Sequence, residues 1–486
     1  MDNKIEVDYD VVIIGAGISG INAAYRVKTQ CPTNSWAIFE ARDAIGGTWD
    51  LFKYPGIRSD SDLHTFGFPW RPWTEQKAIA DGASIAKYIR ETAAAEGIDK
   101  KIHFKHKLSE MDWSSKTNTW TLDVDVDGVQ KEYTARYVIM ASGYYDYNEP
   151  LQASIPGLDN FKGTIIHPQF WPSDLDYADK NMVVIGSGAT AVTLLPNLGE
   201  KAKHVTMLQR SPGYLLSLPS VSPLDTLIRA VLPQSWSHVL IRMRFLVIGY
   251  LFFQFCRAFP SAARKVVKAA TVKQLPKNVP HDPHFEPSYN PWEQRLCICP
   301  DGDFYKSLHE GKCSVSTGHI RTITADTIEL ESGETIPADI IVTATGLKIQ
   351  LAGGAKLSVD GNRINIGDKF LWKGVMLQDL PNAALVMGYT NASWTLGADA
   401  TAQLVTRLIN HMRVNNMAAC VPRLEDEGSL KACPTLNLNS TYVKKAAGMM
   451  PKAGDKGPWQ ARKSYFSDVW NAKFGDVETG LQFYRF

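Results

Sequence analysis

Two glycine-rich segments constrain the fold of this chain more than any other feature. The first, GAGISG at residues 15–20, lies between a short apolar, β-branched run and a segment with helical apolar periodicity. The second, GSGATA at residues 186–191, lies between a similar run and a segment predicted to be helical through Leu198. A strand, a glycine turn and a helix in this order bind dinucleotide phosphates, because the helix N-terminus faces the anion. The sequence therefore predicts an α/β fold with two Rossmann-like dinucleotide-binding domains.

The first glycine segment belongs to a full dinucleotide fingerprint. A second apolar strand, predicted at residues 36–39, ends in Glu40, which lies 20 residues after Gly20. A carboxylate at this place accepts a hydrogen bond from a ribose hydroxyl and repels a 2′-phosphate, so FAD or NAD is favoured.

The loop at residues 46–62 (GGTWDLFKYPGIRSDSD) favours FAD over NAD. Its glycines and aromatic rings suit a flat ring system, whereas composition alone also permits a solvated surface loop with a proline turn at Pro55-Gly56. The residues predicted to bind FAD are Gly15, Gly17, Ser19, Gly20, Glu40, Thr48, Trp49 and Asp60.

The second unit differs at the position of the acid. Its next predicted strand, at residues 204–208, is followed by Gln209-Arg210-Ser211, and an arginine there can pair with a phosphate. The alternative is that Arg210 is a solvated surface residue. We predict that this unit binds NADP through Gly186, Ser187, Gly188, Ala189, Thr190, Ala191, Arg210 and Ser211.

Two further apolar runs, at residues 137–143 and 340–346, end in a small-small-Gly turn and are each expected to close a unit against its nucleotide. The predicted layout is an FAD-binding domain from residues 1–145 and 347–486. An NADP-binding domain at 146–346 lies between its two parts and carries a helical insert at about 222–279.

Composition excludes several classes of function. The net charge is +2, so a nucleic-acid partner has no electrostatic support. The 7 cysteines are scattered and form neither a disulfide framework nor a zinc pattern, so no metal site is predicted and a reducing compartment is favoured. The polar, acidic start MDNKIEVDYD is not a signal peptide, so we expect a cytoplasmic enzyme.

The segment FKGTIIHPQFWP at residues 161–172 has the pattern F-x-G-x-x-x-H-x-x-x-W-P and resembles the signature of class B flavoprotein monooxygenases of the Baeyer–Villiger type. GGTW with YPG and Asp60 matches a second signature of that family. The likeness is strongest to the ethionamide-activating branch, through stretches such as HVTMLQRSP, YNPWEQRLC and GYTNASWTL. The connecting segment is expected to be a hinge between the domains rather than a core strand.

The resemblance implies an activity. NADPH reduces FAD, reduced flavin adds dioxygen, and the resulting flavin C4a-peroxide attacks a ketone that rearranges to an ester or lactone. Arg295 matches the family's catalytic arginine, which stays charged when buried, and Asp60 matches the carboxylate that orients it. Alternatively, Arg295 pairs with Glu293 on a surface loop. His167 and Trp171 match hinge residues, although alone His167 suits a satisfied linker histidine.

The stretch at residues 240–257 is strongly apolar, but its uninterrupted part, residues 245–253, is too short to span a bilayer. One interpretation is a buried helical insert lining the access route of the substrate. The other is a basic, apolar helix resting on a membrane surface. Further on, the turn at 388–394 is expected to face flavin or substrate, ahead of a helix at 399–412.

Three alternatives compete with this interpretation. A pyridine nucleotide–disulfide reductase needs a redox cysteine pair beside the flavin, and no cysteine lies between Cys31 and Cys256. An N- or S-oxygenating flavin monooxygenase and a redox-sensing binding protein remain open. The absence of a charged cluster favours an apolar ketone or sulfur compound as substrate, with O2 as co-substrate. The oligomeric state is not indicated.

Overall fold

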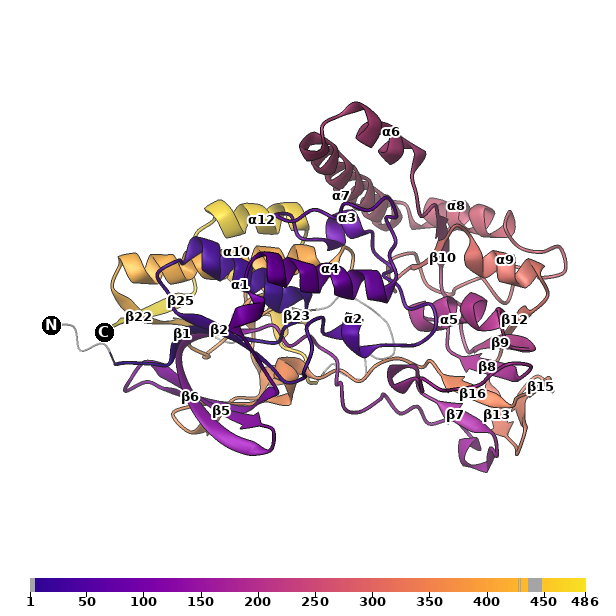
Figure 1. Cartoon of the computed structure of the whole chain (residues 1–486), viewed down its shortest axis with the longest axis horizontal. Helices are drawn as coiled ribbons and strands as arrows, with labels where there is room; N and C mark the ends of the chain where they lie inside the picture. Colours follow the sequence, from indigo (N-terminus) through magenta and orange to yellow (C-terminus); the bar gives the residue numbers. More distant parts are fainter. Residues whose placement is uncertain (1–4, 427, 429, 436–447) are drawn as a thin grey trace.

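The computed structural model describes residues 5–426, 428, 430–435 and 448–486 (Figure 1). Its strands form two main sheets that lie towards opposite ends of the molecule. The first sheet takes its strands from residues 9–140 and 356–385, and the second takes its strands from residues 164–343. We call the two parts of the molecule the first and the second unit.

The first unit contains a nine-stranded sheet of order β18-β17-β4-β5-β6-β1-β2-β3, with β21 also paired to β6. The parallel strands at its centre are buried and rich in apolar, β-branched residues. Strand β1 is an example. Helices α1 and α10 pack together beside it. The elements are β1 (Tyr9–Ile14), α1 (Ile18–Gln30), β2 (Trp36–Glu40), β3 (Ile102–Phe104), β4 (His106–Ser114), β5 (Thr119–Val126), β6 (Val129–Met140), β17 (Lys356–Val359), β18 (Asn362–Arg363), β21 (Ala383–Leu385) and α10 (Trp394–Val414).

The second unit contains a parallel sheet of order β12-β9-β8-β16-β7. Helices α5 and α9 pack against each other beside it, and a small antiparallel sheet (β13–β15) follows β12 along the chain. The elements are β7 (Thr164–Ile166), β8 (Asn181–Ile185), α5 (Ala189–Gly199), β9 (His204–Gln209), α9 (Asp303–His309), β12 (Cys313–Thr317), β13 (Ile320–Ile323), β14 (Thr327–Leu330), β15 (Thr335–Pro337) and β16 (Ile340–Thr343). The predicted α/β class with two Rossmann-like cores is confirmed.

The chain crosses between the units twice, and the two crossings lie side by side. The Asp146 amide donates to the Lys348 carbonyl at 2.8 Å, and the Gln350 amide donates to the Tyr144 carbonyl at 3.0 Å. Lys348 also pairs with the Asp146 carboxylate at 3.0 Å. The connection is therefore a short two-stranded ribbon rather than two independent linkers.

One expectation about the connecting segment is partly wrong. Residues Thr164–Ile166 form β7, which pairs in parallel with β16 as the edge strand of the second sheet. These residues form a strand because two isoleucines and a threonine favour an extended backbone beside the apolar strand β16. The segment from His167 onward leaves the sheet.

The insert is helical, as predicted, but it is not buried. It consists of α6 (Pro223–Val231), α7 (Gln234–Ala258) and α8 (Pro260–Val272). Helix α7 is long and apolar enough to cross a membrane by length and composition, and its most apolar window is only 11% buried. The interpretation as a buried insert is therefore wrong. The helix is also longer than the uninterrupted apolar run at 245–253, because it continues through Arg242 and Arg244, whose side chains bond to His64 and Asp225.

Candidate functional site

The first glycine turn is tightly packed against its neighbours. A methyl group added at Gly20 would lie 1.8 Å from the Gly15 carbonyl oxygen, so only glycine allows α1 to approach β1 this closely. Glu40, at the end of β2, is buried beside this turn. Its carboxylate accepts from the backbone amides of Ala16 at 2.6 Å and Arg42 at 2.9 Å. Each carboxylate oxygen keeps a lone pair for a ribose hydroxyl.

The loop that follows lies on the same turn. The Gly46 amide donates to the Ala16 carbonyl at 3.1 Å, and a methyl group at Gly17 would lie 3.6 Å from the Gly47 Cα. The Thr48 hydroxyl is 3.0 Å from the Tyr147 hydroxyl. Two glycine backbones facing each other leave room for a pyrophosphate, which fits the FAD predicted here.

Helix α10 completes this side of the first unit. The Trp394 indole donates to the Ser19 hydroxyl at 2.9 Å and stacks on Tyr144 at 4.8 Å between ring centroids. The predicted turn at 388–394 therefore reaches the first glycine turn. Tyr144 and Tyr147 were missed in the sequence because they follow the closing strand, where no motif marks them.

The second glycine turn is more open. A methyl group at Gly188 would meet nothing within 4 Å among the described residues, which leaves space for a phosphate above the N-terminus of α5. The Ser187 hydroxyl donates to the Ser211 carbonyl at 2.9 Å, which joins the turn to the end of β9. Arg210 and Ser211 are exposed there. Gln209, just before them, is buried and donates to the His284 carbonyl at 2.7 Å.

Two buried threonine hydroxyl oxygens have no hydrogen-bond partner within the described part of the chain. One belongs to Thr345, beside the glycine that ends the second closing strand, and the other to Thr395, in the first turn of α10. Buried polar groups are normally satisfied, so each of these two hydroxyls can bond to a coenzyme bound beside it. The residues present thus fit a dinucleotide at each turn.

Replacing Arg210 by alanine is expected to raise the KM for NADPH by about ten- to hundredfold. This is the loss of affinity expected when one charge-assisted contact to a phosphate is removed. The KM for NADH should change little, because NADH has no 2′-phosphate. Steady-state NADPH and NADH oxidation would measure both constants, with Arg210→Lys as the variant that keeps the charge. Equal effects on the two coenzymes would contradict the role given to Arg210.

The loop from Tyr54 to Asp60 belongs to the first unit in sequence but lies on the second. A methyl group at Gly56 would collide with the Asn197 amide of α5, at 2.0 Å. The Tyr54 hydroxyl bonds to Thr190, also on α5, and burial raises the pKa of Tyr54 to about 12. The sequence could not reveal these contacts, because they join residues more than a hundred positions apart.

A second contact anchors the same loop. Arg58 forms an ion pair with Asp303 at the start of α9. This pair was also missed, since no pattern in the sequence joins Arg58 to a residue so far along the chain. Together with Tyr54 and Gly56 it fixes the loop to two helices of the second unit.

The structure brings Arg295 and Asp60 together. The guanidinium donates from Nη2 to Asp60 Oδ1 at 3.2 Å and to the Ser61 hydroxyl at 3.3 Å. Glu293 instead accepts from Asn290, at 2.9 Å. The side chains of Arg295 and Asp60 are 38% and 26% exposed, so the pair adds little to stability and is better suited to positioning a charge.

A chain of contacts links this pair to the first glycine turn. Asp62, two residues after Asp60, caps α3 (Leu63–Phe66) by accepting from the Thr65 amide at 2.8 Å. The Thr65 hydroxyl is 2.6 Å from the hydroxyl of Ser393, the residue before Trp394. The loop that carries Asp60 is therefore connected to elements of both units.

His167 lies beside the ribbon between the units, and Trp171 lies four residues further along the chain. His167 Nε2 is 3.3 Å from the Gly346 carbonyl oxygen, and Nδ1 accepts from the Gln169 amide at 3.3 Å. Burial lowers the pKa of His167, which matches a neutral ring that donates from Nε2. Trp171 packs with Tyr54 against the core of the second unit.

The cysteines near the site are not redox-active thiolates. Cys297, on β11 (Cys297–Pro300), is buried, and this burial raises its pKa to about 12. All seven cysteines are free thiols. A disulfide reductase needs a low-pKa cysteine, so this site lacks its chemistry.

Comparison with known proteins gives three kinds of match. The profile of the pyridine nucleotide-disulphide oxidoreductase family matches residues 12–245, which include both glycine turns. The FAD-containing monooxygenase EthA of Mycolicibacterium smegmatis is 46% identical over 471 residues, covering 97% of this chain and 96% of that protein. The probable FAD-binding monooxygenase AlmA of Acinetobacter baylyi is 41% identical over 478 residues, covering 97% and 96%.

Solved structures share the fold at lower identity. An oxidized steroid monooxygenase bound to NADP superimposes with a TM-score of 0.76 at 19% identity, covering 98% of this chain and 100% of that one. A complex of OTEMO with FAD and NADP gives a TM-score of 0.74 at 18% identity, covering 99% and 100%. The arrangement of two nucleotide-binding units thus recurs over the full length of these chains.

Proposed function

Because the chain belongs to the family of FAD-containing monooxygenases, we propose that it uses NADPH and dioxygen to convert apolar ketones into esters or lactones. One oxygen atom enters the substrate between the carbonyl carbon and its neighbour, the other leaves as water, and NADPH becomes NADP⁺. The single observation that carries this proposal is the Arg295–Asp60 pair, a fixed cation beside the loop that joins both units.

Bound FAD supplies the transfer of electrons from NADPH to dioxygen. The residues do the rest by position and charge. Arg295 stabilises the negative charge that develops on oxygen as it attacks the carbonyl carbon, and it does so without losing its own proton. Asp60 positions the guanidinium through the 3.2 Å contact. Glu40 holds a ribose hydroxyl of FAD, and Arg210 holds the 2′-phosphate of NADPH.

We assign each unit to one of the two coenzymes. Residues 1–145 and 347–486 form the FAD-binding domain, and residues 146–346 form the NADP-binding domain. The acid at the end of β2 and the arginine after β9 support this division.

Oxidation of sulfides or thioamides is the second activity of the same site. Electron-rich sulfur takes oxygen without a negatively charged oxidant, so this reaction depends less on Arg295. The alternative is an enzyme that oxygenates only nitrogen or sulfur. The experiment must distinguish it from an enzyme that also converts ketones into esters.

The decisive experiment measures NADPH consumption against linear, cyclic and aryl ketones and aryl sulfides under ¹⁸O₂, with products identified by mass spectrometry. One ¹⁸O atom in an ester or lactone is the expected result. Labelled sulfoxide without any ester from the ketones would favour the alternative, and bound FAD without NADPH oxidation would indicate a redox-sensing protein.

Substitution of His167 is expected to uncouple NADPH consumption from product formation. His167→Asn keeps an acceptor for the Gln169 amide but loses the contact to Gly346, whereas His167→Gln can still donate to that carbonyl. We expect Asn to raise hydrogen peroxide release several-fold and Gln to stay near wild type. Peroxide and product yields per NADPH check this, and unchanged yields in both variants would reduce His167 to a packing role.

A further inference from the structure

The helical insert exposes a large apolar surface. Helix α6 and the first part of α7 project from the rest of the molecule in Figure 1. Among the described residues, 14 of the 27 exposed large apolar side chains lie between Leu224 and Val272, so they are concentrated in a small part of the chain. We call the exposed apolar side chains of α6, α7 and α8 the insert surface. Patches of this kind mark sites of interaction in soluble proteins.

Helix α7 has an outer and an inner face. The outer stripe has residues three or four positions apart, as one face of a helix requires: Trp236, Leu240, Met243, Val247 and Leu251. The inner stripe is buried at Ser237, Ile241 and Cys256. The outer stripe is therefore available to a partner along most of the helix.

Contacts along the inner face fix α7 to the protein. Arg242 donates to the backbone carbonyls of His64 at 2.6 Å and Gly67 at 3.0 Å. Near the other end, Phe253 packs on Trp292 with ring centroids 5.7 Å apart. A helix that crossed a bilayer would lose these contacts, so its outer face is suited to lie along an interface instead.

The charge of this region differs from that of the whole chain. Residues 221–280 hold nine Lys or Arg residues and one acid, Asp225, which gives a net charge of +8 against +2 for the full chain. Asp225 is itself neutralised by Arg244 at 2.5 Å. The remaining residues are thus acidic overall, and positive charge is concentrated around the insert surface.

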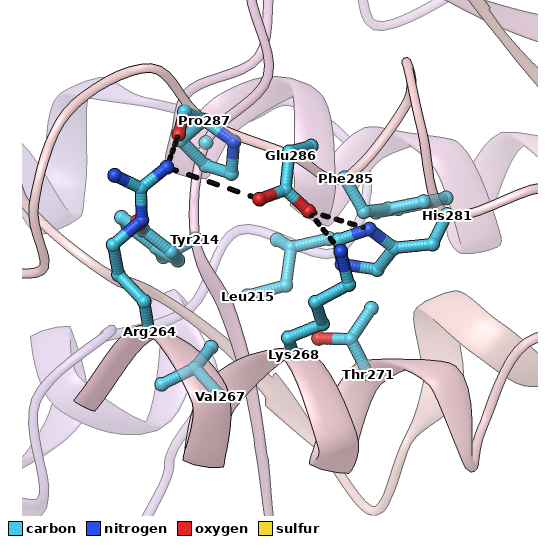
Figure 2. Close-up of a pocket in the computed structure, with 11 residues that line it drawn as sticks. Tyr214, Leu215, Arg264, Val267, Lys268, Thr271, His281, Phe285, Glu286 and Pro287 are labelled. Atoms are coloured by element: carbon cyan, nitrogen blue, oxygen red, sulfur yellow. Dashed lines mark hydrogen bonds and ion pairs between the residues drawn. The ribbon is translucent and has the colours of Figure 1, made fainter. Parts of the chain in front are cut away.

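Figure 2 shows which basic residues of α8 are already used. Arg264 and Lys268 point to Glu286, at 3.8 Å and 2.7 Å, and His281 lies 3.0 Å from the same carboxylate. These contacts fix α8 to the second unit. The basic residues left exposed, with no carboxylate partner in the described ranges, are Arg257, Lys265, Lys273 and Lys277.

We propose that the insert surface binds the surface of a lipid bilayer that carries anionic headgroups, with α7 lying in the interface. Apolar side chains beside exposed lysines and arginines are the pattern of interfacial helices, and each basic residue near an anionic surface adds to binding. A second copy of the chain fits less well, because two insert surfaces of the same positive charge would repel each other. This inference does not depend on the reaction proposed above.

The test is flotation of the FAD-loaded full chain with vesicles of phosphatidylcholine, with and without phosphatidylglycerol. We expect the protein to float with the anionic vesicles, to float much less with the neutral ones, and to be released by high salt. Retention in the aqueous fraction with both vesicles overturns the proposal. So does equal, salt-independent capture by both.

Variants separate the apolar and the charged contributions. Ile248→Asp with Leu251→Asp should lower binding at least tenfold, whereas Val129→Asp with Val414→Asp, at similarly exposed apolar positions on β6 and α10, should not. Lys265→Gln and Lys273→Gln should each weaken binding about fivefold, as expected for about 1 kcal/mol per charge.

Light scattering without vesicles tests whether a second copy of the chain binds the insert surface. The proposal is overturned if the protein does not float and forms a dimer that Ile248→Asp with Leu251→Asp dissociates. NADPH oxidation on a soluble substrate checks that each variant is folded, independently of binding.

Discussion

Replacing Arg295 by alanine is expected to leave the reduction of FAD by NADPH near the wild-type rate and to lower ester formation by about 100-fold or more. The reason is electrostatic, because removal of one fixed donor to a developing oxyanion costs on the order of 10²–10³ in rate. NADPH consumption should continue and release hydrogen peroxide. Anaerobic stopped-flow measures the reduction, and product quantification measures the oxygenation.

Two neighbouring variants serve as controls for Arg295. Arg295→Lys keeps a charge without the planar fork, so it should retain part of the activity. Asp60→Asn keeps the shape of the partner but removes the negative charge that attracts the guanidinium, which lies 3.2 Å from Asp60 Oδ1. This variant should therefore reduce flavin at the normal rate but form less ester. Ester formation at the normal rate in Arg295→Ala would remove this residue from the reaction.

Alanine at the first and the middle glycine of the second turn is expected to give opposite results. Gly186 has φ +146, and a methyl group there would lie 2.2 Å from the Ala344 carbonyl oxygen. Gly186→Ala should therefore lower the free energy of unfolding by roughly 2–4 kcal/mol. Gly188 has φ −83 and open space above it, so Gly188→Ala should change stability by less than about 0.5 kcal/mol.

The coenzyme should distinguish the same two variants. A methyl group at Gly188 enters the space predicted for the pyrophosphate, so the KM for NADPH should rise by about tenfold or more. Thermal unfolding of the FAD-loaded enzyme and NADPH kinetics measure the two effects. An unchanged KM in Gly188→Ala, with normal stability, would contradict NADP binding at this turn.

The local part of the fold could be predicted because its determinants lie close together in sequence. The strand, glycine turn and acid that end at Glu40 lie in one short segment, and the structure has β2 ending at Glu40. The order strand, GSGATA and helix likewise gave β8 and α5 at the expected residues. Helix α10 begins at Trp394, five residues before the predicted start. The preceding turn ends at Ser393, earlier than the polar residues around it suggest.

Long-range contacts could not be predicted in the same way. Tyr54 with Thr190 and Arg58 with Asp303 depend on how two units pack, and no local periodicity encodes that packing. The exposure of α7 was mispredicted for a related reason. An apolar run has the same composition whether it packs in a core or faces a lipid surface.

The docked loop from Tyr54 to Asp60 has a consequence for protein engineering. A chimera that replaced residues 146–346 with the corresponding part of a relative would leave this loop facing foreign partners at positions 190, 197 and 303. The loop, and with it the Asp60 carboxylate, would then lose the surfaces of α5 and α9 that contact Gly56 and Arg58. Exchange of coenzyme specificity by domain replacement therefore requires the loop to be transferred with the second unit, although it is encoded far upstream.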